Sequence, residues 1–162
     1  VQQHGYDSYD DLKKARDELS AKMSDARNTA KSTDADLKLL NEKIHYLGQY
    51  LSTKAAYKAF LQAGNKKMYR SAHKDEIAKY EEAIQFLKHN STDGTIPTMK
   101  NLRAEKEKLL SAQTAQYKSY TYFKDYYHEL QTACRNVDII LETEHTQQHS
   151  RTQPKRSHKP SL

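Results

Sequence analysis

Apolar and small side chains recur along two long stretches of this chain in steps that alternate between three and four residues. The first stretch breaks its rhythm only at Met23, and its positions are Leu12, Ala15, Leu19, Ala26, Ala30, Thr33, Leu37, Leu40, Ile44, Leu47 and Leu51. The second has no break, and its positions are Met99, Leu102, Lys106, Leu109, Gln113, Gln116, Tyr120, Phe123, Tyr127, Leu130, Cys134, Val137 and Leu141. This spacing is typical of a heptad seam along one helix face. It predicts a helix over about 8–63 and another over about 98–144.

Neither predicted helix can bury its seam alone, whereas each can cover the other. Pairing in opposite directions is the economical arrangement, because the segment between the helices then folds back at one end. The contact is weak in places: the first helix is rich in Ala, Ser and Thr over 21–35, and the second carries Lys106, Gln113 and Gln116 on its seam. A splayed base or a second chain that fills the gap, making a homodimer, stays open as an alternative.

Local signals mark the ends of the predicted helices. Ser8 and Thr98 are suitable N-caps, Gly64 stands where a left-handed cap would end the first helix, and Asn65 is a cap candidate for the next segment. The connecting segment of about 65–93 is also helical in outline. We expect it to form a small helical tip whose core gathers Tyr57, Phe60, Leu61, Met68, Tyr69, Ile77, Tyr80 and Phe86.

Composition agrees with a thin helical fold. Of 162 residues, 36% are hydrophobic and 30% charged, and only four Gly and three Pro are present. We predict an all-α chain, an elongated antiparallel two-helix coiled-coil hairpin with a small helical tip subdomain over 1–144. A flexible, disordered basic tail follows over 145–162, where the sequence is polar and contains two prolines.

The sequence also predicts a cellular setting. No apolar run approaches the roughly 20 residues that span a bilayer, and no charged and apolar leader opens the chain, so we expect no membrane contact and a cytoplasmic location. Cys134 has no second cysteine to pair with, which is compatible with a reducing compartment. Because the chain begins with Val1 and not Met, we expect it to be part of a longer protein.

Charge is segregated along the chain. Residues 43–74 contain seven Lys and Arg and no acid, 145–162 contain four and no acid, and the rest carries all 21 Asp and Glu. Basic residues interleaved with Tyr and Phe suit single-stranded nucleic acid, because cations neutralise phosphates while rings stack on bases. The competing interpretation is a solvated helix face whose aromatic residues belong to the tip core. The candidate nucleic-acid-binding residues are Lys54, Lys58, Lys66, Lys67, Arg70 and Lys74.

No catalytic, cofactor or metal site is predicted. The one close histidine pair, His145 and His149, has the spacing of two ligands on one helix face, but it lies in the polar tail, where a frayed helix end is the better explanation. Tyr127 beside His128 suggests a nucleophile and a base, yet Tyr127 occupies a seam position and so favours core packing. Cys134 also lies on the seam, as a small buried residue. No Gly-rich phosphate loop or nucleophilic triad is present.

An ordered series of residues resembles a known family. The order is LNEKIHYLGQYLSTKAAYKAF, AGNKKMYRSAHKDEIAKYEEAIQFL, IPTMKNLRAEKEKLL and a final aromatic-rich helix ending NVDIIL, and HGYDSYDDL resembles the stretch that enters this region. Over about 4–141 the chain resembles the C-terminal region of relaxases of the relaxase/mobilization nuclease family, from mobile elements of Gram-positive bacteria. The resemblance implies a parent protein that nicks one DNA strand with a tyrosine nucleophile and a histidine-held metal and pilots that strand in conjugation.

Two functions follow as expectations. The first is a non-catalytic helical domain of a conjugative relaxase, not itself an enzyme, that assists transfer by contacting DNA, single-stranded in particular, through the basic tip. The second is a coiled-coil interaction arm that dimerises or docks a coupling protein or an accessory conjugation protein.

Overall fold

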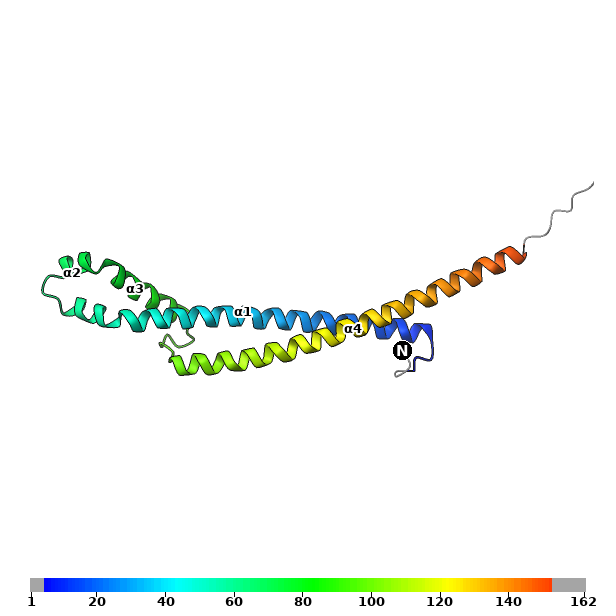
Figure 1. The fold of residues 1–162 in the computed structure, drawn as a ribbon, viewed down its shortest axis with the longest axis horizontal. Helices are drawn as coiled ribbons and strands as arrows, with labels where there is room; N and C mark the ends of the chain where they lie inside the picture. The colour runs from blue at the N-terminus through cyan, green and yellow to red at the C-terminus, as the bar shows by residue number, and fades with distance from the viewer. Residues whose placement is uncertain (1–4, 153–162) are drawn as a thin grey trace, which may run out of the picture. The chain divides into compact units, whose positions relative to one another are not determined.

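The computed structural model describes residues 5–152, with side chains described as far as Gln148, and all its regular elements within that range are α-helices. Two long helices, α1 (Tyr9–Gln62) and α4 (Met99–Thr152), flank two short ones, α2 (Lys66–Ala72) and α3 (Lys74–His89) (Figure 1). The all-α prediction is therefore confirmed. α4 continues beyond the predicted end at 144 because neither Gly nor Pro interrupts the sequence before Pro154. The remainder of the predicted tail, 153–162, lies outside the described residues.

Side-chain caps start three of the helices. The Asp11 amide donates to Ser8 Oγ at 3.1 Å, the Met68 amide to Asn65 Oδ1 at 3.0 Å, and the Asn101 amide to Thr98 Oγ1 at 3.2 Å. These are the three caps that the sequence predicted.

Gly64 does not adopt the predicted left-handed cap. Within the described residues, positive φ occurs only at Gly94, with φ of 69°, in the loop before α4. Asp93 fixes that loop by accepting from the hydroxyls of Thr95 and Ser91 at 2.7 and 2.8 Å and from the Thr95 amide at 3.0 Å. These bonds, led by that of the Thr95 hydroxyl, lower the pKa of Asp93 to about 2.

Internal packing divides the chain into two units, each described by itself. The first combines the start of α1, as far as Arg27, with α4 from Lys118 onward. Its core consists of Leu12, Leu19, Leu130 and Cys134, and the residues packed against it include Phe123, Tyr127 and Val137. The predicted seams supplied these positions on both helices.

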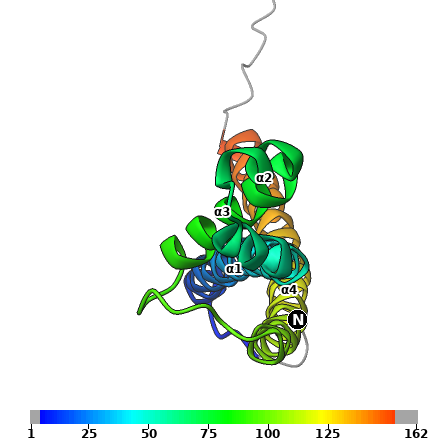
Figure 2. The same cartoon turned by 90° about the vertical axis from the view of Figure 1, so that its left-hand side faces the viewer.

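The second unit, Asn28–Tyr117, holds the rest of α1, both short helices and the start of α4. Figures 1 and 2 show α3 along one side of α1 and the first part of α4 along another. The buried core joins Leu40 and Leu47 of α1 to Leu87 of α3 and Leu102 of α4. Because Asp34 contacts Gln113 and Tyr117 while Leu47 clusters with Leu102, α4 runs opposite to α1 within this unit.

The covered part of each seam is shorter than predicted. Leu51 is 52% exposed, since α1 continues past the level at which α4 begins. Leu141 is 44% exposed, since α1 starts at Tyr9, which contacts Cys134 and Asp138. Leu61 and Met68, expected in the tip core, are 54% and 72% exposed. Ile77 was expected there and is buried, at 1% exposure.

Candidate nucleic-acid interface

The last turns of α1 carry two of the predicted lysines on one face. Lys54 and Lys58 are four residues apart and both exposed, so they lie one above the other along the helix. Neither forms a salt bridge within the described residues, and the Lys54 ammonium lies 5.6 Å from the centre of the Tyr50 ring. Both charges are therefore free to meet an anion.

Three more of the predicted lysines lie on the short helices. Lys66 and Lys67 open α2 and Lys74 opens α3, and all three are exposed and without a salt bridge among the described residues. The exposed Met68 follows the first two directly. The sequence pattern thus identified five accessible ammonium groups in the second unit.

Arg70 is engaged within the protein. Its guanidinium donates to Glu81 Oε2 at 2.8 Å and lies 5.7 Å from the Phe60 ring centre. The ion pair is exposed, at 53% and 41% for the two side chains, and such pairs contribute only about 0–1 kcal/mol. Its consequence is electrostatic: α3 brings an acid beside a segment that contains none in its own sequence. Glu76 does the same for His73, whose Nδ1 lies 2.9 Å from Glu76 Oε2.

The aromatic side chains interleaved with these cations stack on one another. Tyr57 and Tyr80 are stacked with centroids 3.9 Å apart, and Tyr69 stacks on His73 at 4.3 Å. Phe60 lies 6.5 Å from Tyr69 in a tilted arrangement, linking α1 to α2. Since these rings are half-buried and pack the short helices against α1, their first role is structural. The part of the site that faces solvent consists mainly of lysine.

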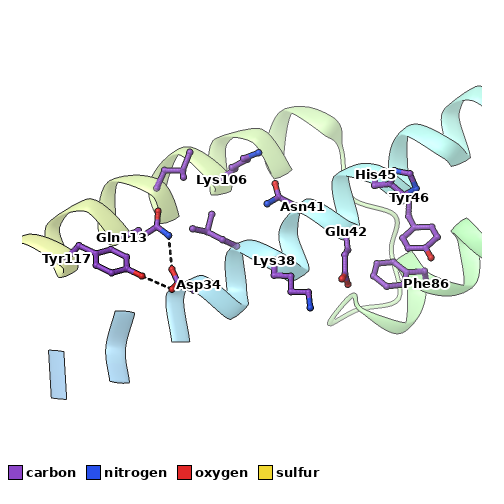
Figure 3. Close-up of a pocket in the computed structure, with 12 residues that line it drawn as sticks. Asp34, Lys38, Asn41, Glu42, His45, Tyr46, Phe86, Lys106, Gln113 and Tyr117 are labelled. Carbon is purple, nitrogen blue, oxygen red and sulfur yellow. Dashed lines mark hydrogen bonds between the residues drawn. The ribbon is translucent and has the colours of Figure 1, made fainter. Parts of the chain in front are cut away.

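An open groove of about 950 Å³ lies elsewhere in the second unit, between α1 and α4 (Figure 3). Its lining combines charged and polar side chains, among them Lys38, Glu42, His45 and Lys106, with the apolar side chains of Leu37, Phe86 and Leu110. It coincides with the predicted weak part of the seam, where α4 offers polar side chains in place of apolar ones.

Asp34 compensates for this weak seam. Its carboxylate accepts from Gln113 Nε2 at 2.7 Å and from the Tyr117 hydroxyl at 2.9 Å, as the dashed lines in Figure 3 show. The bond from Gln113 and then that from Tyr117 lower the pKa of Asp34, while the same carboxylate raises the pKa of Tyr117. One turn further along α4, the buried Oε1 of Gln116 has no hydrogen-bond partner among the described residues. The seam heptads predicted the polar positions but not Asp34, which lies one residue off the seam.

The first unit contains a tyrosine contact that the seam pattern did not reveal. Tyr6 and Tyr126 join their hydroxyls at 2.6 Å, and the Tyr9 hydroxyl donates to Asp138. The bond to Asp138 raises the pKa of Tyr9 to about 12, and burial raises that of Tyr126 to about 12. These contacts tie the start of the chain to α4, and the hydroxyls of Tyr9 and Tyr126 stay protonated at neutral pH.

From the sequence, a few residues are candidates for catalysis or metal binding, and two of them, Tyr127 and Cys134, are expected to pack in the core. Tyr127 is packed against the first core, Cys134 is 2% exposed within it, and His145 is exposed on α4. The side chain of His149 lies outside the described residues. Among the side chains that are described, no three of His, Cys, Asp or Glu are grouped so that they could hold a metal ion.

Comparisons with family models, curated proteins and solved structures found no match for this chain. Of the helices described, none has the length and apolar character that crossing a membrane requires.

Proposed function

We propose that this chain is a non-catalytic helical domain of a conjugative relaxase that assists DNA transfer by holding DNA through its exposed lysines. The family assignment rests on the ordered resemblance over about 4–141. The contact with DNA rests on one observation: Lys54, Lys58, Lys66, Lys67 and Lys74 are all exposed and form no salt bridge within the described residues.

In this proposal the long helices pair as an antiparallel coiled-coil hairpin, with α2 and α3 as a small tip subdomain. Its support is the pairing within each unit, where Leu12 shares a core with Cys134 and Leu47 shares one with Leu102. A coiled-coil hairpin of this kind would act as a spacer whose tip presents cations to DNA.

The mode of binding is phosphate contact without base reading. Ammonium groups neutralise phosphates and release counterions, which gives affinity that depends on salt and not on sequence. Because the nearby rings already stack on one another, base stacking contributes little in this proposal. Single strands remain the expected partner, since a flexible backbone adapts to lysines spread over three helices.

The test compares two double variants by fluorescence anisotropy with a labelled single strand at low salt. Lys66→Gln with Lys67→Gln is expected to weaken binding on the order of tenfold or more, through the loss of two phosphate contacts. The matched control, Lys31→Gln with Lys38→Gln, removes the same charge from exposed positions elsewhere on α1 and is expected to change affinity far less. Equal losses in the two variants would reduce the interface to general charge attraction and reject the proposal.

An interaction arm is the second candidate. The observation that favours it is exposed apolar surface at two places on the long helices, around Leu51 and Leu61 and over Ile139 to Leu141. Coupling or accessory conjugation proteins and a second copy of the chain are the partners expected from sequence.

A further inference from the structure

Each long helix continues its seam past the point where its partner covers it. On α1 the covered positions Leu40, Ile44 and Leu47 are followed, in the same three and four steps, by Leu51, Lys54, Lys58 and Leu61. We call residues 51–61 the α1 extension. Its two leucines are 52% and 54% exposed, so the face is uncovered.

The later part of α4 shows the same feature. Beyond Asp138, which contacts Tyr9, the side chains of Ile139, Ile140 and Leu141 are 51%, 56% and 44% exposed. The α4 extension, residues 139–148, continues the seam through Leu141 to Glu144. Three consecutive exposed apolar residues on a helix are unusual without a partner.

The two extensions have opposite charge. The α1 extension carries Lys54 and Lys58 and lies in a segment without acids, 43–74. The α4 extension carries Glu142 and Glu144 and has no Lys or Arg. All four charged side chains are exposed, and none forms a salt bridge in the described part of the chain.

We infer that the α4 extension of one molecule docks on the α1 extension of a second copy of this chain. Both surfaces have exposed apolar side chains to bury, and their charges are complementary, with lysines on one surface and glutamates on the other to fix the orientation. Nucleic acid would suit the two lysines but would leave Leu51 and Leu61 in water, and it would be repelled by Glu142 and Glu144.

The contact joins two different surfaces, so it either occurs twice in a closed dimer, where each copy offers both surfaces, or links chains in series. Few apolar side chains take part, which makes the contact weak, dependent on concentration and sensitive to salt.

Sedimentation of the full chain over a concentration series at low salt tests the inference. The unaltered chain is expected to associate as concentration rises. Lys54→Glu with Lys58→Glu, and separately Glu142→Lys with Glu144→Lys, are each expected to weaken association about tenfold or more, because like charges then face each other. All four sites are exposed, so helix content by circular dichroism is expected to stay unchanged.

Exchanging the charges of the two surfaces gives the decisive experiment. The two double variants, each weak alone, are expected to associate when mixed, and a single chain carrying all four changes is expected to recover association. A chain that stays monomeric at every concentration, or a mixture that does not associate, would overturn the inference.

A further control separates this contact from DNA binding. Lys66→Gln with Lys67→Gln lies outside both extensions and is expected to leave self-association unchanged while weakening the binding of a single strand. Loss of association in this variant would contradict the assigned surfaces, whereas unchanged DNA binding would reject only the proposed function.

Discussion

The uncovered α1 extension makes a sharp prediction about two leucines that are neighbours on the same seam. Leu47 is 2% exposed, in the core shared by α1, α3 and α4, whereas Leu51 is 52% exposed. Truncation of a buried leucine to alanine loses both burial and packing and typically costs about 2–5 kcal/mol. Truncation of a half-exposed one on a surface helix changes the free energy of unfolding by no more than about 0.5 kcal/mol.

The assay is urea unfolding followed by circular dichroism at 222 nm, with the protein dilute enough to be monomeric. With a urea slope of about 2 kcal/mol per molar, a loss of about 3 kcal/mol for Leu47→Ala lowers the midpoint by about 1.5 M. Leu51→Ala is expected to move it by about 0.3 M or less. Comparable losses at both positions would mean that the seam is covered past Leu47, and both the fold description and the docking surface on α1 would then be wrong.

Three further predictions concern single positions. The hydrogen bonds from Gln113 and Tyr117 lower the pKa of Asp34, so the ionised Asp34 carboxylate stabilises the fold above its ordinary pKa, and this contribution is lost as pH falls through the lowered value. Asp34→Asn should therefore be less stable than the unaltered chain at neutral pH, and the urea midpoints of the two proteins should converge in acid. Gly94→Ala places a Cβ at φ of 69° and should cost about 1 kcal/mol in the same urea assay, and an unchanged midpoint would argue against the left-handed turn. Asn65→Ala removes the cap on α2 and should speed amide exchange at Met68, with a cost of about 1 kcal/mol confined to that helix.

The helices could be predicted from sequence because their signals are local and repeated. The three and four steps identified the buried positions Leu19, Leu40 and Leu130, and short polar side chains at Ser8, Asn65 and Thr98 identified the starts. The spacing of apolar residues does not predict the position at which each seam ceases to be covered by the other helix. The heptad pattern continues through Leu51 and Leu141, and only the offset between the two helices shows that these residues are uncovered.

The candidate site was predicted in part, for a similar reason. A run of basic residues without acids locates the lysines, but the pairing of Arg70 with Glu81 depends on how α2 and α3 fold against each other. Tyr57 and Tyr80 stack on each other only because α1 and α3, which are separate in the sequence, pack together in the fold. The order of residues shows where charges lie along the chain, whereas binding depends on which charges lie close together in the folded protein.

The salt dependence of single-strand binding tests the central claim most directly. In dilute, monomeric protein no second copy covers Lys54 and Lys58, and the five lysines that form no salt bridge among the described residues can each contact a phosphate. The logarithm of the binding constant then falls with the logarithm of salt concentration with a slope of about −3.5, at about −0.7 per contact. Lys66→Gln with Lys67→Gln is predicted to reduce the steepness by about 1.4. Absence of binding at low salt, or a slope that these substitutions leave unchanged, would contradict the account.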